Sequence, residues 1–511
     1  MISYSEFIHK SPIEYLSDYT DDLSSDFSVS LNGKEIPCYT CRISKHPFNR
    51  PWPGHQRELE QTELASFVNI VADEEVSLSV KINKKYEKIM IRPFSKNVEF
   101  KDENGTVTFN LNEGQYVFAT DNLHSPLFIF VTKPIICENP DSVTYYFGPG
   151  VHFPGKITLK DNETVYADKD AHVFGAIYAN GAKNIKIYGN GLFDDSFEER
   201  FSAPCYSEYT NGNVKFYNCE NVSVEGVLFK DSAIWCVNLF HCFNVSIDNI
   251  KVFGQWRYNT DGIDIVNSRD ILIKSSFIHS FDDTITIKGI LAYKDTNNEN
   301  IVTDGCVIWC DWGKALEIGI ETACKENKNI IFRNTDIIRG GNTYLDIQNG
   351  AYSETHHILF ENINAEYNSF DTRPEFHIAD GDFYTKENEK FVPSLIYIQN
   401  HRFIRDFLEN GKWGLKAPWC HAEPLDEPLV DVSDIEFSTN HHIFFKNINV
   451  YYDEKIEKVD GKYNVPIRIT SKLQDIRHYD IEIDNLSING EKIEEKDVLL
   501  FIENSEKVII K

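Results

Sequence analysis

The sequence predicts an all-β protein built mainly as a parallel β-helix. A short unit, a polar residue followed by alternating apolar positions, recurs along the chain, at intervals of 23 to 30 residues between Asn221 and His357. The units have a period of two and almost no helical periodicity, so each buries its apolar side only by stacking on its neighbours. Abundant Val, Ile, Phe and Tyr, with only two Met, also favour strands. The units begin at Asn184, Asn221, Asn244, Asp270, Asn300, Asn329, His357, His442, Asp480 and Lys507.

A β-sandwich or a propeller is the alternative fold. A propeller would repeat every ~40 to 50 residues with signatures of its own, and we do not find them.

The first 135 residues have a different pattern and are expected to form a separate domain. Isolated alternating runs separated by turn residues replace the repeated unit, as in an antiparallel β-sandwich. A sandwich at 1–135 could cap the open end of a β-helix at 136–511, which would otherwise expose an unpaired edge. The runs begin at Phe27, Val76, Ile89, Thr106, Tyr116 and Leu127.

A second irregular region, from about 366 to 440, is expected to be a long insertion packed over one side of the coils. Pro, Gly and aromatic residues gather there and the repeat stops. Trp413, Trp419 and His421 could form a sugar platform, because aromatic faces accept the apolar face of a pyranose. The same residues could equally form a small core of the insertion.

Composition restricts the partners. The formal net charge is −28, so nucleic acid, an anionic membrane and an acidic polysaccharide would all meet net repulsion, unless a local basic cleft overrides it. The eleven Cys are scattered and odd in number, which is unlike a disulfide framework. Without a signal-like start or a long apolar stretch, the expected location is cytoplasmic, or secreted if a leader has been removed. The expected partner is a carbohydrate, with no nucleic acid, membrane or cofactor, and the oligomeric state stays open.

Two acidic motifs stand one repeat apart. These are Asn259-Thr260-Asp261-Gly262 and the pair Asp282-Asp283. Three carboxylates brought together by neighbouring coils are what acid/base cleavage of a glycosidic bond requires. We therefore predict that Asp261, Asp282 and Asp283 are catalytic.

Strand alternation adds further residues to this outer face. If Ile263, Ile265, Ile285 and Ile287 point inward, then Asp264, Asp282 and Lys288 point outward. The same parity places Glu317, Asp346 and Gln348 outside in the next two coils. Crowded acids repel one another, so at least one pKa is expected to be raised. No metal ligand is predicted. The predicted substrate-binding residues are Asn259, Asp264, Lys288, Lys314, Glu317, Asp346 and Gln348, together with Trp413, Trp419 and His421.

These motifs resemble a known family. Asn259-Thr-Asp-Gly, Phe281-Asp-Asp and Gly313-Lys-Ala-Leu-Glu-Ile-Gly319 look like successive motifs of the polygalacturonase-type enzymes of glycoside hydrolase family 28. Trp235 and Tyr188–Asp194 resemble its upstream coils. A sandwich ahead of a β-helix also resembles the dextranases and isopullulanases of family 49. The resemblance implies a right-handed β-helix and hydrolysis with inversion, with Asp282 as general acid and Asp261 with Asp283 activating water.

The chain also departs from family 28. Gly313-Lys314-Ala315 stands where the pectin-cleaving relatives have Gly-His-Gly, and Asp346-Ile347-Gln348 where they have Arg-Ile-Lys. Losing two cations removes the partners of a uronate carboxylate. We therefore expect a neutral oligo- or polysaccharide, of α-glucan or α-galactoside type, cleaved from the chain end.

Three other functions stay open at this point. A pectin-type galacturonan hydrolase would use the same acids. A calcium-dependent polysaccharide lyase would use the acidic cluster as a metal site. A non-catalytic carbohydrate-binding β-helix would have no need of three convergent acids.

Overall fold

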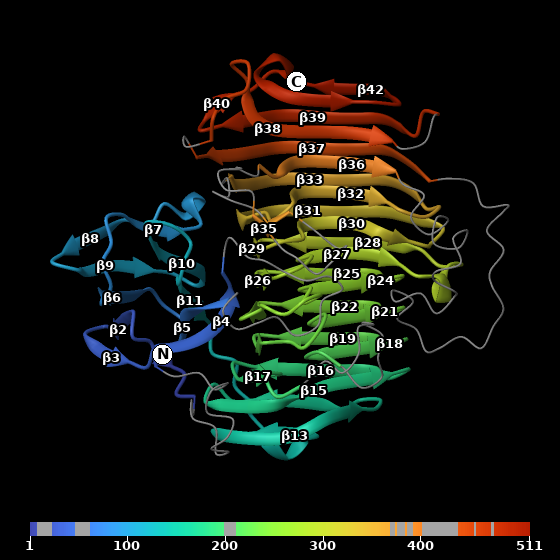
Figure 1. The fold of residues 1–511 in the computed structure, drawn as a ribbon. Helices are drawn as coiled ribbons and strands as arrows, with labels where there is room; N and C mark the ends of the chain where they lie inside the picture. The colour runs from blue at the N-terminus through green and yellow to red at the C-terminus, as the bar shows by residue number, and fades with distance from the viewer. Residues whose placement is uncertain are drawn as a thin grey trace.

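The structure is a computed structural model of the 511-residue chain, drawn in Figure 1. It describes residues 1–7, 23–45, 62–198, 211–367, 374–375, 384–385, 392–400, 438–453, 456–471 and 475–511. No helix within these ranges is long and apolar enough to cross a membrane.

The N-terminal part is a sandwich of two packed sheets. Phe27, Leu78, Phe118 and Ile129 are among the side chains that fill the space between them. The pairing is antiparallel as predicted, except that β5 and β11 run parallel. One sheet contains β1 (Ile2–Tyr4), β4 (Tyr39–Ser44), β5 (Thr62–Ala72), β7 (Ile89–Arg92), β10 (Gly114–Thr120) and β11 (Leu127–Thr132). The other contains β2 (Phe27–Leu31), β3 (Lys34–Ile36), β6 (Val76–Ile82), β8 (Phe100–Glu103) and β9 (Thr106–Leu111).

From residue 145 onward the chain winds into the predicted parallel β-helix, and its strands stack into three faces (Figure 1). The first face contains β12 (Tyr145–Phe147), β14 (Thr164–Ala167), β16 (Lys183–Gly189), β19 (Glu220–Glu225), β22 (Phe243–Asp248), β25 (Arg269–Lys274), β28 (Asn298–Asp304), β31 (Glu326–Arg339), β33 (Glu354–Tyr367), β37 (Thr439–Tyr452), β39 (His478–Ile488) and β42 (Ser505–Ile510).

The second face lies next to the sandwich, and the third face carries the acidic motifs. The second contains β13 (Gly150–Leu159), β15 (Ala171–Asn180), β17 (Leu192–Asp194), β20 (Leu228–Lys230), β23 (Lys251–Phe253), β26 (Phe277–Ser280) and β29 (Val307–Cys310). The third contains β18 (Val214–Tyr217), β21 (Val237–Phe240), β24 (Ile263–Val266), β27 (Ile285–Gly289), β30 (Lys314–Thr322), β32 (Thr343–Asn349), β36 (Ser394–Asn400), β38 (Tyr463–Ser471) and β41 (Val498–Ile502).

Short elements complete the described residues. They are the paired strands β34 (Pro374–Glu375) and β35 (Tyr384–Thr385), the strand β40 (Glu491–Lys492), and the 3-10 turns Phe94–Lys96, Pro140–Ser142, Leu291–Tyr293 and Glu495–Asp497.

The polar residue that opens each repeat unit forms a corner of the coil. All ten predicted unit starts have a positive φ, for example 58° at Asn221 and 53° at Asn244. Asn tolerates this left-handed conformation better than most residues, because its short side chain bonds locally. The Nδ2 of Asn244 donates to Asn221 Oδ1 at 2.7 Å, and the Nδ2 of Asn221 donates to Asn184 Oδ1 at 3.0 Å. The repeat is therefore a ladder of asparagine corners that fixes the register between coils.

The inward positions of the third face are those that alternation predicts. Ile263, Ile265, Ile285 and Ile287 are fully buried in one continuous apolar core that runs through the coils. Because their neighbours in sequence must point the other way, the acidic side chains of the motifs lie on the outer side.

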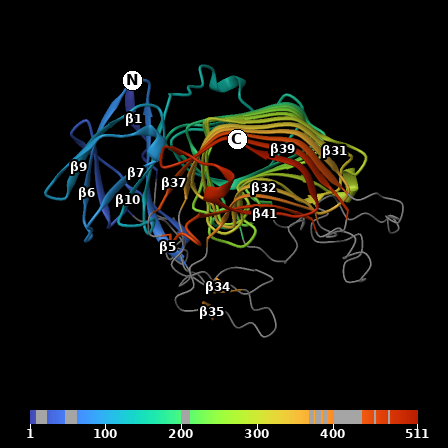
Figure 2. The same ribbon diagram turned by 90° about the horizontal axis from the view of Figure 1, so that it is seen from above.

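The sandwich does not cap the end of the β-helix, contrary to the sequence-based expectation. It packs against the flank of the second face, as Figures 1 and 2 show. The ring of Phe128 lies 5.4 Å from that of Phe277 and 5.8 Å from that of Trp309, and Phe67 lies 4.8 Å from Phe253. Outward aromatic residues of successive coils provide this contact surface, and single-strand patterns do not reveal it.

The predicted insertion at 366–440 is interrupted. Ser394–Asn400 forms strand β36, which pairs with β32 on one side and β38 on the other, so it belongs to the coils. Its apolar side chains Leu395, Ile396 and Ile398 are buried in the core. The long separation of this strand from its neighbours in sequence hid it in the repeat analysis.

The asparagine ladder leads to a stability prediction at the exposed corner residue Asn244. The Asn244→Ala variant loses both the left-handed preference and the bond to Asn221, so we expect a loss of roughly 1 to 2 kcal/mol. The Asn244→Gly variant keeps the backbone freedom and loses only the side-chain bond, so it should lose less. Thermal unfolding followed by circular dichroism tests this order, and an alanine variant as stable as the parent would contradict it.

Candidate active site

The backbone ladder brings the two acidic motifs together on the third face. Asp261 lies just before β24, and Asp282 and Asp283 lie just before β27. The N–H of Gly262 donates to the carbonyl of Asp283 at 2.9 Å, and the N–H of Cys236 donates to the carbonyl of Asp261 at 2.9 Å. The register therefore stacks Asp261 on Asp283 in adjacent coils, with Asp282 one residue before.

Two glycines allow this close stacking. A Cβ at Gly313 would stand 2.5 Å from the backbone N of Asp283 and 2.6 Å from its Oδ1. A Cβ at Gly262 would stand 2.4 Å from the carbonyl oxygen of Thr284. Any side chain at either position would displace the turn that holds the acids.

Lys288 lies at the centre of three of the carboxylates. Its Nζ is 2.7 Å from Asp261 Oδ2, 3.0 Å from Asp264 Oδ1 and 3.6 Å from Asp283 Oδ2. The same Nζ lies 3.9 Å from the ring centroid of Trp235. One buried ammonium group therefore contacts acids from two coils. The sequence of either motif alone does not predict this shared contact.

Lys314 also points into the cluster. Its Nζ is 3.2 Å from Asp283 Oδ1 and 3.0 Å from Glu317 Oε1, and its backbone N–H donates to Asp283 Oδ1 at 3.2 Å. Asp283 therefore contacts both lysines.

The outward ladder of the third face runs in register through Asp264, Thr286, Glu317, Asp346 and Tyr397. Asp264, Glu317 and Asp346 nevertheless have no solvent-exposed area, whereas Asp282 and Asp283 keep 7% and 6%. The ladder acids are therefore closed off from solvent, a difference from their expected contact with substrate.

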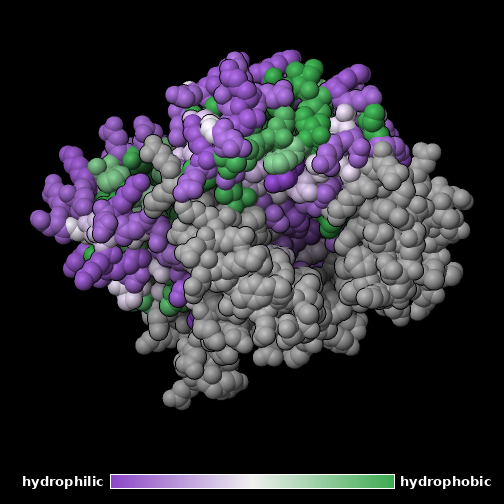
Figure 3. All heavy atoms as spheres, turned by 45° about the horizontal axis from the view of Figure 1, so that its top comes forward, coloured by the Kyte–Doolittle hydropathy of each residue, from purple (hydrophilic) through white to green (hydrophobic). Residues whose placement is uncertain are grey.

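Gln348 lies over a ladder acid, whereas Asn259 lies in the turn before β24. Gln348 is 8% exposed, and its Nε2 donates to Asp346 Oδ2 at 3.2 Å, so the amide covers the buried acid. Asn259 has φ of 53° and forms the turn that leads into Asp261. Trp413, Trp419 and His421 lie outside the described residues. On one side of the molecule, Figure 3 shows a hollow whose visible floor is hydrophilic.

The two lysines set the ionisation of the acids. Burial alone would raise the pKa of Asp283, but Lys314 and then Lys288 outweigh it and hold the pKa at about 2. Burial raises the pKa of Asp261 well above its usual range, with Lys288 opposing and the neighbouring acids adding to the rise. Asp283 is therefore held in its ionised form near neutral pH.

The pKa values of the ladder acids Asp264 and Asp346 are raised as well. Burial raises the pKa of Asp264 to about 7 against the effect of Lys288, and the pKa of Asp346 to about 7 against that of Lys314. The predicted rise is confirmed, but burial rather than mutual repulsion is its larger cause.

Aromatic side chains that the sequence-based site did not include support the acidic turns. Phe281 stacks on Trp312 at 5.8 Å and meets Tyr258 edge-on at 5.7 Å. Each of the three precedes or flanks an acidic motif in sequence, a position that could have indicated them.

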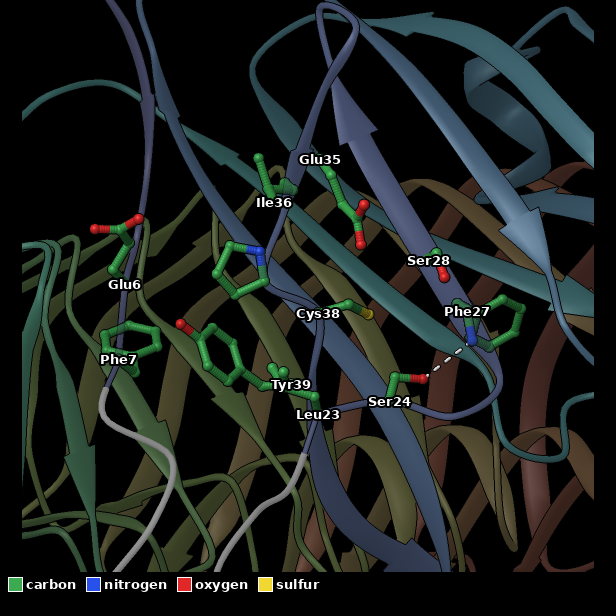
Figure 4. A pocket seen from close by; sticks show the side chains of 11 residues that line it. Glu6, Phe7, Leu23, Ser24, Phe27, Ser28, Glu35, Ile36, Cys38 and Tyr39 are labelled. Carbon is green, nitrogen blue, oxygen red and sulfur yellow. Dashed lines mark hydrogen bonds between the residues drawn. The ribbon is translucent and has the colours of Figure 1, made fainter.

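A second hollow, in the sandwich, has a different character. The cavity of about 490 Å³ is lined by Glu6, Phe7, Ser24, Glu35 and Tyr39, among others (Figure 4). Burial raises the pKa of the Cys38 thiol there to about 12, so this thiol is no nucleophile at neutral pH.

The raised pKa of Asp346 predicts how stability depends on pH. Its folded pKa is about 7, above the unfolded value of about 3.9, so the folded state holds the extra proton between these values and stability falls as pH rises through that window. In the Asp346→Asn variant this contribution is absent, so the variant should gain up to a few kcal/mol relative to the parent between about pH 4 and pH 7. Melting temperatures across this range test it, with the exposed Asp295→Asn as control. Parallel curves for parent and Asp346→Asn would contradict it.

Comparison with known proteins agrees with the motifs. Residues 144–368 match the family model described as Glycosyl hydrolases family 28. The chain is 25% identical over 191 residues to an Exopolygalacturonase of Cochliobolus carbonum, covering 35% of this chain and 40% of that protein. It is 23% identical over 242 residues to the Putative galacturan 1,4-alpha-galacturonidase C of Aspergillus niger, covering 42% and 55%. The matches thus span about half or less of the length of these relatives.

The fold has a counterpart over nearly the whole chain. Dex49A from Penicillium minioluteum aligns with 99% of this chain and 97% of its own, with a TM-score of 0.60 and 13% identity. This likeness concerns the fold, sandwich and β-helix together. The resemblance to glycoside hydrolase family 28 in residues 144–368, with some likeness in fold to family 49, is therefore confirmed.

Proposed function

We propose that the protein is a glycoside hydrolase that inverts the anomeric centre. The observation that carries this proposal is the stacking of Asp261 on Asp283 around the shared ammonium of Lys288, with Asp282 beside them. Inversion requires an acid on one side of the bond and a base that activates water on the other.

We assign different tasks to the three acids. Asp283, ionised through its contacts with Lys314 and Lys288, deprotonates the water, and Asp261 helps to position it. Asp282 retains the largest exposed fraction of the three, 7%, and donates the proton to the leaving oxygen. Lys288 and Lys314 position the carboxylates.

The lysines also argue against the other classes of function. Both ammonium groups sit among the carboxylates, where a calcium ion of a lyase would need the oxygens. A purely binding protein would gain nothing from burying several acids against a desolvation cost. Hydrolysis, in contrast, requires carboxylates held close together, which accounts for this unfavourable burial.

We infer that the substrate is a neutral glycan. Lys288 and Lys314 are already paired with acids, and Gln348 covers the buried Asp346 where a cation would be needed for a uronate. Hydroxyl groups can pair with an amide and with carboxylates, whereas a uronate carboxylate beside them would be left without a partner.

Galacturonan is the second candidate substrate. It is supported by the names of the relatives, which include an Exopolygalacturonase and a Putative galacturan 1,4-alpha-galacturonidase. The prefix of the first name also supports cleavage from the chain end for either substrate.

A product screen separates these substrates. Neutral α-glucans and α-galactosides should release sugar, galacturonans should not, and proton NMR of the fresh product should show the inverted anomer. Single sugars should be released from the outset if cleavage starts at the chain end. Release from galacturonan alone would reverse the substrate assignment, and a retained anomer would exclude the mechanism.

Asp282→Asn tests the general acid. The amide preserves shape but carries no transferable acidic proton, so kcat should fall by about 10² to 10⁴. Asp270→Asn is the matched control, because Asp270 is an exposed corner residue with φ of 58°, where Asn also fits. Hydrolysis by the Asp282→Asn variant at the parental rate, with an unchanged melting temperature, would refute the role of Asp282.

A further inference from the structure

A second group of titratable side chains lies on the first face, away from the acidic motifs. Glu326 begins β31 and Glu354 begins β33, and the two are direct partners in the parallel register. His356 stands two residues after Glu354, so strand alternation places both on the same side. Neighbouring coils thus present two carboxylates and an imidazole together.

The ligand atoms of this group converge. His356 Nε2 is 3.3 Å from Glu326 Oε1, and one ligand atom from each of Glu326, Glu354 and His356 lies within 4.8 Å of the others. Tetrahedral zinc needs separations of roughly 3.3 Å between ligands. The side chain of Glu354 is 50% exposed, so it has room to close this gap and an ion has access from solvent.

Neighbouring groups orient both carboxylates. Glu326 Oε2 accepts from Lys328 Nζ at 2.7 Å and from Asn297 Nδ2 at 2.8 Å, which leaves Oε1 facing His356. Glu354 Oε1 lies 2.8 Å from Nε2 of His441 in the next coil. Hydrogen-bonded carboxylates of this kind are typical of metal sites, where such outer contacts fix the ligands.

The imidazole of His356 is also held in one orientation. Its ring is parallel to that of His441, at 2° and with centroids 5.1 Å apart, and its Nδ1 lies 2.6 Å from Nδ1 of His357. With Nδ1 engaged, Nε2 is the nitrogen directed toward the glutamates.

We propose that Glu326, Glu354 and His356 bind one divalent transition-metal ion of the zinc type, with His441 and Lys328 as supporting contacts. Imidazole selects such ions over calcium and magnesium, which prefer oxygen ligands alone. The ion would link β31 to β33 and stabilise the C-terminal half of the coil stack. This proposal is independent of the hydrolase function.

Calorimetric titration of zinc chloride into the chelator-treated full chain tests the site. We expect one ion per chain, with binding weakened at least tenfold in Glu354→Gln and in His356→Gln. Saturating zinc should raise the parental melting temperature by roughly 2 to 5 °C and leave those two variants nearly unchanged.

Matched controls and a competing ion complete the experiment. Glu361→Gln lies on the same strand β33, and His124→Gln lies in the sandwich, so both should bind zinc as the parent does. Glu354 and His356 are partly exposed, so their substitution should leave the fold intact. Equal melting temperatures of the parent and of Glu354→Gln and His356→Gln without metal would show that the variants fold. Absence of saturable binding, equal zinc affinity in Glu354→Gln and His356→Gln, or calcium binding as tight as zinc would each overturn the proposal.

Discussion

The register of the coil-to-coil hydrogen bonds positions the core, the corners and the acidic face together. Left-handed corners occupied mainly by Asn, such as Asn221 and Asn244, stand at the start of the first-face strands at the same point of every turn. Because the corners are linked by side-chain amides, a slip by one residue would break the ladder and expose the apolar core. The same register stacks Asp261 on Asp283, so the pairing of the coils fixes the geometry of the acidic site.

Burial and charge oppose each other on the third face. Moving several carboxylates out of water is unfavourable, and two ammonium groups offset only part of this cost. The resulting ionisation pattern is uneven: Asp283 has a pKa held low by Lys314 and Lys288, whereas Asp264 and Asp346 have pKa values near 7. The acids of this face therefore differ in protonation state near neutral pH.

The sandwich and the β-helix are joined along their sides. Aromatic packing between Phe128 and Phe277 and the ion pair between Arg92 and Glu366 connect the sandwich to coils well separated in sequence. The sandwich therefore supports the flank next to the acid-bearing face and leaves that face clear of its own strands (Figure 2). The first face remains available for the proposed metal site.

The all-β class, the stacked repeat and the inward positions Ile263, Ile265, Ile285 and Ile287 could be predicted from the chain, because alternation and left-handed corners are local properties. The spacing of the motifs also predicted that Asp261 and Asp283 lie close together, since adjacent coils place matching turns side by side. The docking of the sandwich, the coil strand Ser394–Asn400 and the pairing of Lys288 and Lys314 with the acids emerge only in three dimensions. Those outcomes depend on contacts between distant segments and on burial, and neither can be read from the spacing of residues along the chain.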